Sequence, residues 1–238
     1  MADPRTADAP RYAIYFAPPA DSALHRIGSG WLGYDAATGE DLPPDLPTEI
    51  AREDWQTATE EPRRYGLHAT LKPPFRLAPG TTEAALIAKL SVFATGRPPF
   101  VLPALGLVRI GRFLALVPGN DCAELSALAG DCVTMFDEFR APPSEADLVR
   151  RRAAGLTPGQ EEMLGRWGYP YVLDEFRFHM TLTGPLDDTA ASRFSAELTS
   201  RLAPVLAKPL RIDALSLFVQ PSKESRFRIL RRFALGGL

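Results

Sequence analysis

The sequence repeats one short pattern, His-x-Thr-Leu, once in each half of the chain, at residues 68–71 and 179–182. Around the second copy, apolar residues at even positions 176 to 182 alternate with polar residues at odd positions 177 to 183. The first copy alternates in the same way. This period of two predicts a half-buried strand with its histidine and threonine on the face away from the core. Two of the 3 histidines in the chain lie in this frame.

The motifs belong to a larger internal repeat. In each half, the motif strand is followed by a helical pattern and then by two further strand patterns. The repeats cover about 48–139 and 171–238, and a strand at 11–17 is expected to join their sheets. Runs of strands with helices predict an α+β fold with antiparallel sheets, arranged as two pseudo-symmetric lobes around a central cleft. The chain 1–238 is then one bilobal domain, and segment 140–170, which has no counterpart in the first half, is an insertion of lid type.

Local signals give sharper expectations. The first motif strand is expected to run from about Tyr65 to Lys72 and to stop at Pro73-Pro74, since proline cannot donate to a strand ladder. Tyr65 falls on the core row of that strand, so a packing role is expected for it. His25 lies outside the repeated motif, and a surface loop position is expected for it.

Composition narrows the function classes. With 24% charged residues and a net charge of −2, the chain has no global attraction for nucleic acid or anionic membranes. Cys122 and Cys132 lie ten residues apart in a helical pattern and point in different directions, so no disulfide is expected. Free thiols and the absence of a signal-like segment indicate a cytoplasmic protein. No apolar run is long enough to cross a bilayer, so no membrane partner is expected.

The paired motifs point to acid–base chemistry. If the lobes face one another, His68 and His179 lie on opposite sides of a reacting centre and can act as base and acid in one displacement. Thr70 and Thr181 can donate hydrogen bonds to phosphoryl oxygens. Lys72 and Arg177 either add positive charge for a phosphate or are solvated strand ends. The sequence does not assign base and acid between the two histidines.

Both complete motifs resemble those of the two-histidine (2H) phosphoesterase superfamily. Segments 31–39, 65–75 and 175–184 resemble more closely a bacterial branch associated with phosphonate metabolism and found near carbon–phosphorus lyase genes. The resemblance implies a metal-independent attack of water on a cyclic phosphodiester, with the histidines as base and acid and the threonines on the phosphate. The branch implies a small-molecule substrate, a phosphoribosyl cyclic phosphate, and no cofactor.

Two alternatives stay open from the sequence. A 2′,3′-cyclic phosphodiesterase acting on RNA ends or nucleotides would need a basic groove with aromatic stacking groups, and the net charge of −2 and the insertion argue against it. A non-catalytic phosphate- or RNA-binding module would keep the cleft without turnover. A metal site and a P-loop kinase are not indicated, because neither zinc-ligand spacing nor a Gly-rich phosphate loop occurs.

Overall fold

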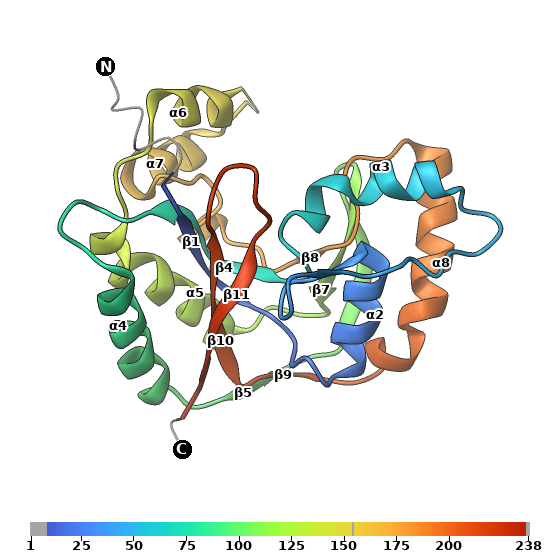
Figure 1. Cartoon of the computed structure of the whole chain (residues 1–238), viewed down its shortest axis with the longest axis horizontal. Coiled ribbons are helices and arrows are strands. Elements are labelled where there is room, and N and C mark those ends of the chain that lie inside the picture. The colour runs from blue at the N-terminus through green and yellow to red at the C-terminus, as the bar shows by residue number, and fades with distance from the viewer. Residues whose placement is uncertain (1–8, 154, 237–238) are drawn as a thin grey trace.

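The computed structural model of the chain, which describes residues 9–153 and 155–236, contains one seven-stranded antiparallel sheet in the order β11-β10-β1-β4-β8-β7-β6 (Figure 1). Its strands are β1 (Arg11–Phe16), β4 (Ala69–Arg76), β6 (Leu105–Ile110), β7 (Phe113–Pro118), β8 (Met180–Thr181), β10 (Ala214–Gln220) and β11 (Arg228–Ala234). Two short ladders pair β2 (Tyr34–Asp35) with β3 (Glu40–Asp41), and β5 (Phe100–Leu102) with β9 (Leu210–Ile212). The predicted α+β class with antiparallel sheets is confirmed.

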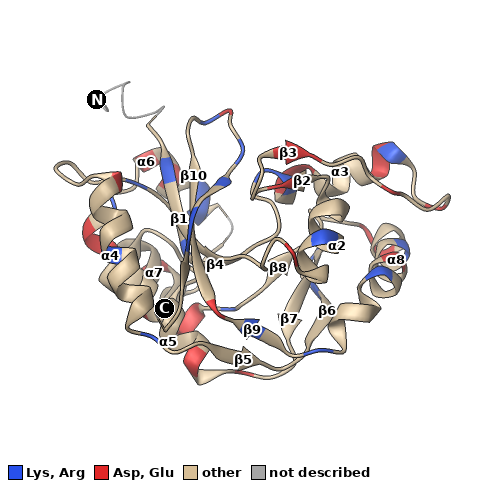
Figure 2. Cartoon of the chain, turned by 60° about the horizontal axis from the view of Figure 1, so that its bottom comes forward, with Lys and Arg blue, Asp and Glu red and all other residues tan. Residues whose placement is uncertain are grey.

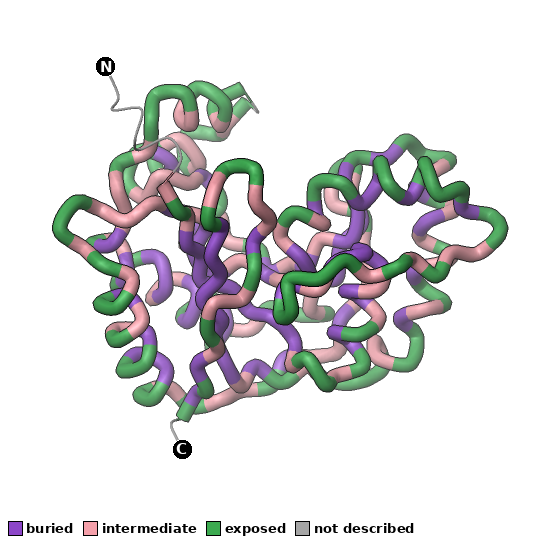
Figure 3. The backbone as a smooth tube through the Cα atoms, in the orientation of Figure 1, coloured by how far each residue is buried: buried purple, intermediate pink, exposed green. Residues whose placement is uncertain are grey.

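The helices of the chain are α2 (Ala23–Leu32), α3 (Arg52–Arg63), α4 (Glu83–Thr95), α5 (Ala123–Met135), α6 (Glu145–Arg152), α7 (Pro158–Trp167) and α8 (Asp188–Leu206), with short 3-10 turns at Asp137–Phe139 and Leu173–Glu175. Some of them pack directly on the sheet. Helix α4 packs on β10 and β11 and α5 on β4, whereas α8 packs on β6 and β7 with α2 beside it (Figure 1). Buried residues follow the strands and the inner faces of the helices, and exposed residues lie outside (Figure 3).

The sequence explains how α4 and α8 form. Thr82 caps α4 by accepting from the Ala85 amide, and Asp187 caps α8 by accepting from the Ala190 amide. Each helix then buries an apolar stripe at helical spacing. The stripes consist of Leu86, Leu90, Phe93 and Ala94 in α4, and of Ala191, Phe194, Leu198 and Leu202 in α8. Acidic and basic residues are mixed on the remainder of α8 (Figure 2).

The two repeats are interleaved in the sheet. The first repeat supplies β4 to one half of the sheet and β6 and β7 to the other, and the second repeat supplies β10 and β11 to the first half and β8 to the second. The halves meet at two antiparallel joints, where Ala69 pairs with Met180 and Val101 pairs with Arg211. Strand β1 lies between β10 and β4, in a position equivalent to that of β7 between β6 and β8.

The first motif strand does not stop at Pro73-Pro74, and this expectation was wrong. Strand β4 continues to Arg76, with two register shifts against β1, one between the Thr70 and Lys72 pairings and one between the Lys72 and Phe75 pairings. Such bulges accommodate prolines because the extra residues make no ladder hydrogen bond. The second motif strand is shorter than expected, since only Met180–Thr181 is paired.

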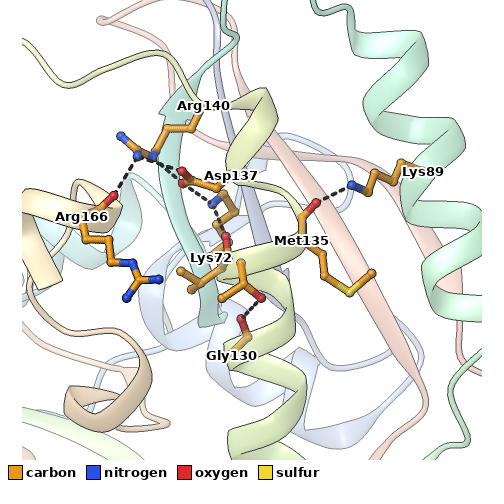
Figure 4. Close-up of polar contacts among 9 residues, drawn as sticks. Lys72, Lys89, Gly130, Met135, Asp137, Arg140 and Arg166 are labelled. Carbon is orange, nitrogen blue, oxygen red and sulfur yellow. Dashed lines mark hydrogen bonds and ion pairs between the residues drawn. The ribbon is translucent and has the colours of Figure 1, made fainter.

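The first bulge reverses the direction of Lys72. Tyr15 lies opposite Thr70, but its neighbour Ile14 lies opposite Lys72, so Leu71 is the extra residue and Lys72 turns to the helix-covered face. There Lys72 is 1% exposed, and its Nζ donates to the Val133 carbonyl at 2.9 Å and lies 3.5 Å from Asp137 Oδ1 (Figure 4). Lys72 therefore has an internal structural role and does not share a face with His68 and Thr70.

Other expectations can be compared directly. His25 is buried in α2, with Nε2 3.1 Å from Asp35 Oδ1, so its expected surface-loop position was wrong. Cys122 and Cys132 are free thiols, as expected. The insertion forms α6, capped by Ser144, and α7, which begins with a capping box of Thr157 and Gln160. Within the described ranges, no helix combines the length and apolar character needed to span a membrane.

The burial of Lys72 can be tested through the pH dependence of protein stability. Burial lowers the pKa of Lys72 to about 8. Above that pH the folded protein has released a proton that the unfolded chain still binds. The free energy of unfolding should therefore rise with pH, by up to roughly 1 kcal/mol per pH unit. The rise should end near pH 10.5, the ordinary pKa of a lysine in the unfolded chain. We expect Lys72→Met to fold and to lose this increase, as measured by urea unfolding from pH 7 to 10.5. An unchanged slope in the variant would contradict the internal placement.

Candidate active site

The two His-x-Thr motifs meet where β4 pairs with β8. The antiparallel pairing of Ala69 with Met180 sets His68 beside Thr181 and Thr70 beside His179. Each imidazole therefore lies next to the hydroxyl of the other motif. The two histidines lie on a diagonal, with their Cα atoms about 8 Å apart by the rise and spacing of strands.

The central residues of the motifs fix which way the polar side chains point. Ala69 and Met180 are both 0% exposed and belong to the main hydrophobic core. Because side chains alternate along a strand, the histidine and threonine on either side of them point to the opposite face. All four of these polar residues are partly exposed. The structure thus brings together the four residues that the sequence singled out most strongly.

The two imidazoles are oriented in the same way. His68 Nδ1 lies 2.9 Å from the Gly66 carbonyl oxygen, and His179 Nδ1 lies 2.8 Å from the Arg177 carbonyl oxygen. In both cases the acceptor is the backbone two residues earlier, so in the neutral ring Nδ1–H donates. Each Nε2 is then left with a lone pair that can accept a proton. This matched tautomer is the state required of a general base.

Gly66 makes the first of these contacts geometrically feasible. Its φ of +72° is in the left-handed region, and an added Cβ would lie 2.7 Å from the Ala36 Cβ. The turn at Gly66 directs its carbonyl at His68, and it also breaks the alternation that assigned Tyr65 to the core row. Tyr65 is instead partly exposed, and its ring stacks with His68 at 5.6 Å and with Phe227 at 5.0 Å.

Tyr15 is a site residue that the sequence analysis missed. Its ring stacks on His68 with centroids 4.1 Å apart. Burial raises the pKa of Tyr15 well above its usual range, and Tyr15 lies opposite Thr70 in the register of β1 and β4. Tyr15 therefore adjoins both polar residues of the first motif. The available signal was the alternation of β1, which places Tyr15 on the face opposite Ile14 and Phe16.

The surroundings of the two motifs differ at this position. Tyr15 lies opposite Thr70, whereas the smaller Ala115 lies opposite Thr181. The aromatic neighbour of His179 is Phe113, tilted at 5.9 Å. The ring of His68 is thus covered by a stacked tyrosine, and the ring of His179 has no stacked counterpart among the described residues.

The electrostatics follow from this packing. Burial lowers the pKa of His68 to about 4, partly offset by the Gly66 carbonyl, and positive charge on His179 adds to the decrease. Burial also lowers the pKa of His179, and the charge of Arg177 acts in the same direction. The effect of His179 on His68 shows that the rings are near enough to interact. Both rings are therefore neutral at pH 7 before an anion binds.

The two remaining predicted site residues, Arg177 and Lys72, differ in their position relative to the motifs. Arg177 is exposed and adjoins His179 through its carbonyl and its charge, so it flanks the site. Lys72 lies on the other face of the sheet and does not belong to the site. Among the described residues, no three His, Cys, Asp or Glu side chains gather into a group that could hold a metal ion.

A comparison with protein-family models identifies the family of this chain. Residues 70–228 match the model of a family described as "Protein of unknown function (DUF1045)". The chain belongs to this family. The matched region of the DUF1045 chain contains Thr70 and the whole second motif. In both motifs, and in the antiparallel α+β architecture that carries them, the chain resembles the two-histidine phosphoesterases.

Two curated relatives have the same name, "Ribose 1,5-bisphosphate phosphokinase PhnN". The protein from Janthinobacterium sp. (strain Marseille) is 42% identical over 212 residues, which is 87% of this chain and 47% of the relative. The protein from Laribacter hongkongensis (strain HLHK9) is 36% identical over 221 residues, which is 93% of this chain and 51% of the relative. The DUF1045 chain thus spans about half the length of these relatives.

Two solved structures show some likeness to this chain. A structure titled "Crystal structure of phosphoesterase" is 14% identical with a TM-score of 0.42, covering 95% of this chain and 98% of that chain. E. coli LigT complexed with 3'-AMP is 16% identical with a TM-score of 0.42, covering 94% of this chain and 97% of that chain.

The role of Tyr15 can be measured by titration. We expect Tyr15→Ala to admit water to His68 and to move the pKa of His68 from about 4 upward toward its ordinary 6.5, because less desolvation penalises the charged ring. Tyr15→Phe keeps the stacked ring and should leave the low pKa in place. Histidine ring signals followed by NMR from pH 3 to 8 provide the measurement. An equal upward shift in both variants would show that the stack is not the cause.

Proposed function

We propose that this protein hydrolyses a cyclic phosphodiester without a metal ion, with His68 and His179 as a base–acid pair and Thr70 and Thr181 on the phosphate. The observation that supports this proposal best is the pairing of the two motifs about Ala69 and Met180. It puts two proton-accepting Nε2 atoms and two hydroxyl donors on one partly exposed face.

The diagonal arrangement suits an in-line displacement. In phosphoryl transfer the entering and leaving oxygens lie on opposite sides of phosphorus. One neutral imidazole takes a proton from water as its oxygen forms the new P–O bond. The other imidazole, protonated, donates its proton to the ring oxygen as the old P–O bond breaks. The product is a phosphomonoester with a free hydroxyl, and the two rings end with their protonation states exchanged.

The acid must be protonated, although both rings are neutral in the free protein. A bound phosphodiester carries a negative charge, and an opposite charge within a few ångströms favours the protonated imidazole. Tyr15 covers His68 and disfavours its charged form, whereas Ala115 leaves more room near His179. We therefore assign His68 as the base that activates water and His179 as the acid that protonates the leaving oxygen.

The hydroxyls stabilise the charge that develops on the phosphoryl group. Thr70 and Thr181 lie on the other diagonal of the same four-residue arrangement, so they can donate to the two non-bridging oxygens. Arg177, exposed beside His179, would add positive charge at the rim of the site.

The substrate class we propose is a phosphoribosyl cyclic phosphate from phosphonate breakdown. The curated relatives are named for an enzyme of ribose 1,5-bisphosphate, a phosphorylated ribose. Their kinase activity is not assigned to this region, because the present sequence has no P-loop of the form G-x-x-x-x-G-K-[ST]. The resemblance to the phosphonate-associated branch points to the same class of small sugar phosphates.

A second candidate is a 2′,3′-cyclic phosphodiesterase of nucleotides or RNA ends. The partly exposed Tyr65 favours it, since an aromatic ring beside a phosphate site can hold a base. Competition between ribose cyclic phosphates and short oligonucleotides with 2′,3′-cyclic ends would separate the two substrate classes. A non-catalytic module would bind either ligand and release no product.

The catalytic pair is tested by substitution. His68→Ala and His179→Ala should each lower kcat/KM for cyclic phosphodiester hydrolysis by about 10²–10⁴-fold, as expected for loss of a general base or acid. The double variant should lose much less than the product of the two effects, because the residues act as a unit. EDTA should have no effect. His25→Gln, at the third histidine, is the matched control and should keep wild-type turnover. Strong inhibition by EDTA, or full activity of either alanine variant, would refute the proposal.

A further inference from the structure

An apolar surface lies open on the catalytic face of the second half of the sheet. Leu114 and Leu116 of β7 are buried in the main core, so the residues that alternate with them point to the opposite face. Ala115, which lies opposite Thr181, shows that this is the face of the second motif. The register of β6 against β7 adds the neighbours of this row. The surface consists of Val108, Ile110, Phe113 and Val117, which are all half-buried.

The rest of the chain does not cover these four side chains. None of them is part of the two hydrophobic clusters of the described residues, or is among the half-buried residues that pack on those clusters. The first half of the sheet differs. On the same face, Tyr15, Phe218 and Phe227 are buried in a closed cluster, and the Tyr34 hydroxyl donates to the Phe227 carbonyl at 2.9 Å. An apolar surface that is open on one side only indicates contact with a ligand.

Phe113 is held in a fixed position relative to the second motif. Its ring centroid lies 5.9 Å from that of His179. On one side of Phe113, the Leu114 amide donates to Thr183 Oγ1 at 2.9 Å, and Thr183 is 0% exposed. On the other side, the carbonyl of the preceding residue accepts from the Leu186 amide at 2.7 Å. The aromatic ring and the imidazole therefore belong to one rigid unit.

The surface is formed by uncharged side chains. Strands β6 and β7 contain a single charged residue, Arg109, and alternation places it with Leu107 on the α8 side of the sheet. There its guanidinium forms an ion pair with Asp188 at 2.7 Å. The side chains of the open surface offer no hydrogen-bond partner to a phosphate group or to a sugar hydroxyl. They suit the nonpolar C–H face of a sugar ring.

The proposed proton transfers place the sugar on this side of the phosphate. Ring opening breaks the bond between phosphorus and the leaving oxygen, and that oxygen stays on the sugar. Because His179 is the acid that we assign to this oxygen, the sugar lies toward His179 and its neighbour Phe113, whereas Tyr15 covers the water side at His68. Residues two apart on a strand are about 7 Å apart and neighbouring strands about 5 Å, so the surface matches one five-membered ring with its substituents.

We infer that Phe113, with Ile110 and Val108 beside it, is a platform for the sugar ring that carries the cyclic phosphate. The C–H face of the ring packs on the face of Phe113 and keeps the leaving oxygen on the His179 side. The inference rests on the proposed function and makes it more specific. It names Phe113 as the residue that selects a cyclic phosphate with a sugar ring over the bare cyclic phosphodiester.

The test compares a ribose cyclic phosphate with ethylene glycol cyclic phosphate, which has a five-membered cyclic phosphodiester and no sugar. In the wild-type protein, kcat/KM should be higher for the ribose compound. In Phe113→Ala this preference should fall roughly tenfold or more, mainly through a higher KM for the ribose compound, because an aromatic contact with an apolar surface is lost. Phe113→Tyr keeps the ring face and should retain the preference. Val101→Ala, a truncation at an exposed apolar position of β5, is the matched control and should behave as the wild type.

The outcomes separate this inference from the proposed function. If the wild type hydrolyses both compounds and Phe113→Ala leaves their ratio unchanged, the platform is refuted and the hydrolase function stands. If neither compound is hydrolysed, calorimetric titration with the same two compounds decides. Tighter binding of the ribose compound that Phe113→Ala abolishes would support the platform while the hydrolase function fails, and equal binding of both compounds would refute the platform as well.

Two other occupants of the surface would overturn the inference. A nucleoside 2′,3′-cyclic phosphate that is hydrolysed faster than the ribose compound, with an advantage that Phe113→Ala removes, would place a base on Phe113 instead of a sugar. A wild-type dimer in analytical ultracentrifugation that Phe113→Glu converts to a monomer would make the surface a contact between two copies of the chain.

Discussion

One antiparallel residue pair, Ala69 with Met180, fixes the register in which the two halves of the sheet are joined. Both residues are small or flexible and fully buried, and their packing in the core fixes the direction of the polar residues beside them. A slip of one residue would turn Ala69 outward and bury an imidazole, so the core selects the register strongly. The same pair lies at the centre of the four-residue arrangement of His68, Thr70, His179 and Thr181. Stability and chemistry thus depend on the same contact.

The sequence was sufficient for features that depend on local pattern. The alternation around each motif and the α+β class with antiparallel pairing were both predictable. The direction of Lys72 was not, because it depends on a bulge whose position is set by the partner strand β1. Tyr15 was missed for a similar reason: it is distant in sequence from His68, and nothing near it shows which strand will lie beside it. Non-local register is what the sequence patterns did not contain.

A duplicated scaffold would present the same surroundings to both histidines, and this chain departs from that symmetry on one side. Tyr15 covers His68, whereas Ala115 takes the equivalent position near His179. The insertion with α6 and α7 also lies on the side of β1 and β4 (Figure 1). The substrate that we propose, a cyclic phosphodiester attached to a larger sugar, is itself asymmetric, and these differences would favour one orientation of it. On this account the repeat supplies the chemistry, and the departures from the repeat supply the choice of substrate and of proton donor.

We propose that two imidazoles from opposite halves of the sheet act on one phosphorus atom, and a crystal structure of the wild-type protein with bound orthovanadate is the direct test. We expect one vanadium centre with oxygens in hydrogen-bond contact with Nε2 of both His68 and His179 and with the hydroxyls of Thr70 and Thr181. An oxyanion held by one motif alone, with the other imidazole turned away from it, would show that the two histidines do not act on one centre.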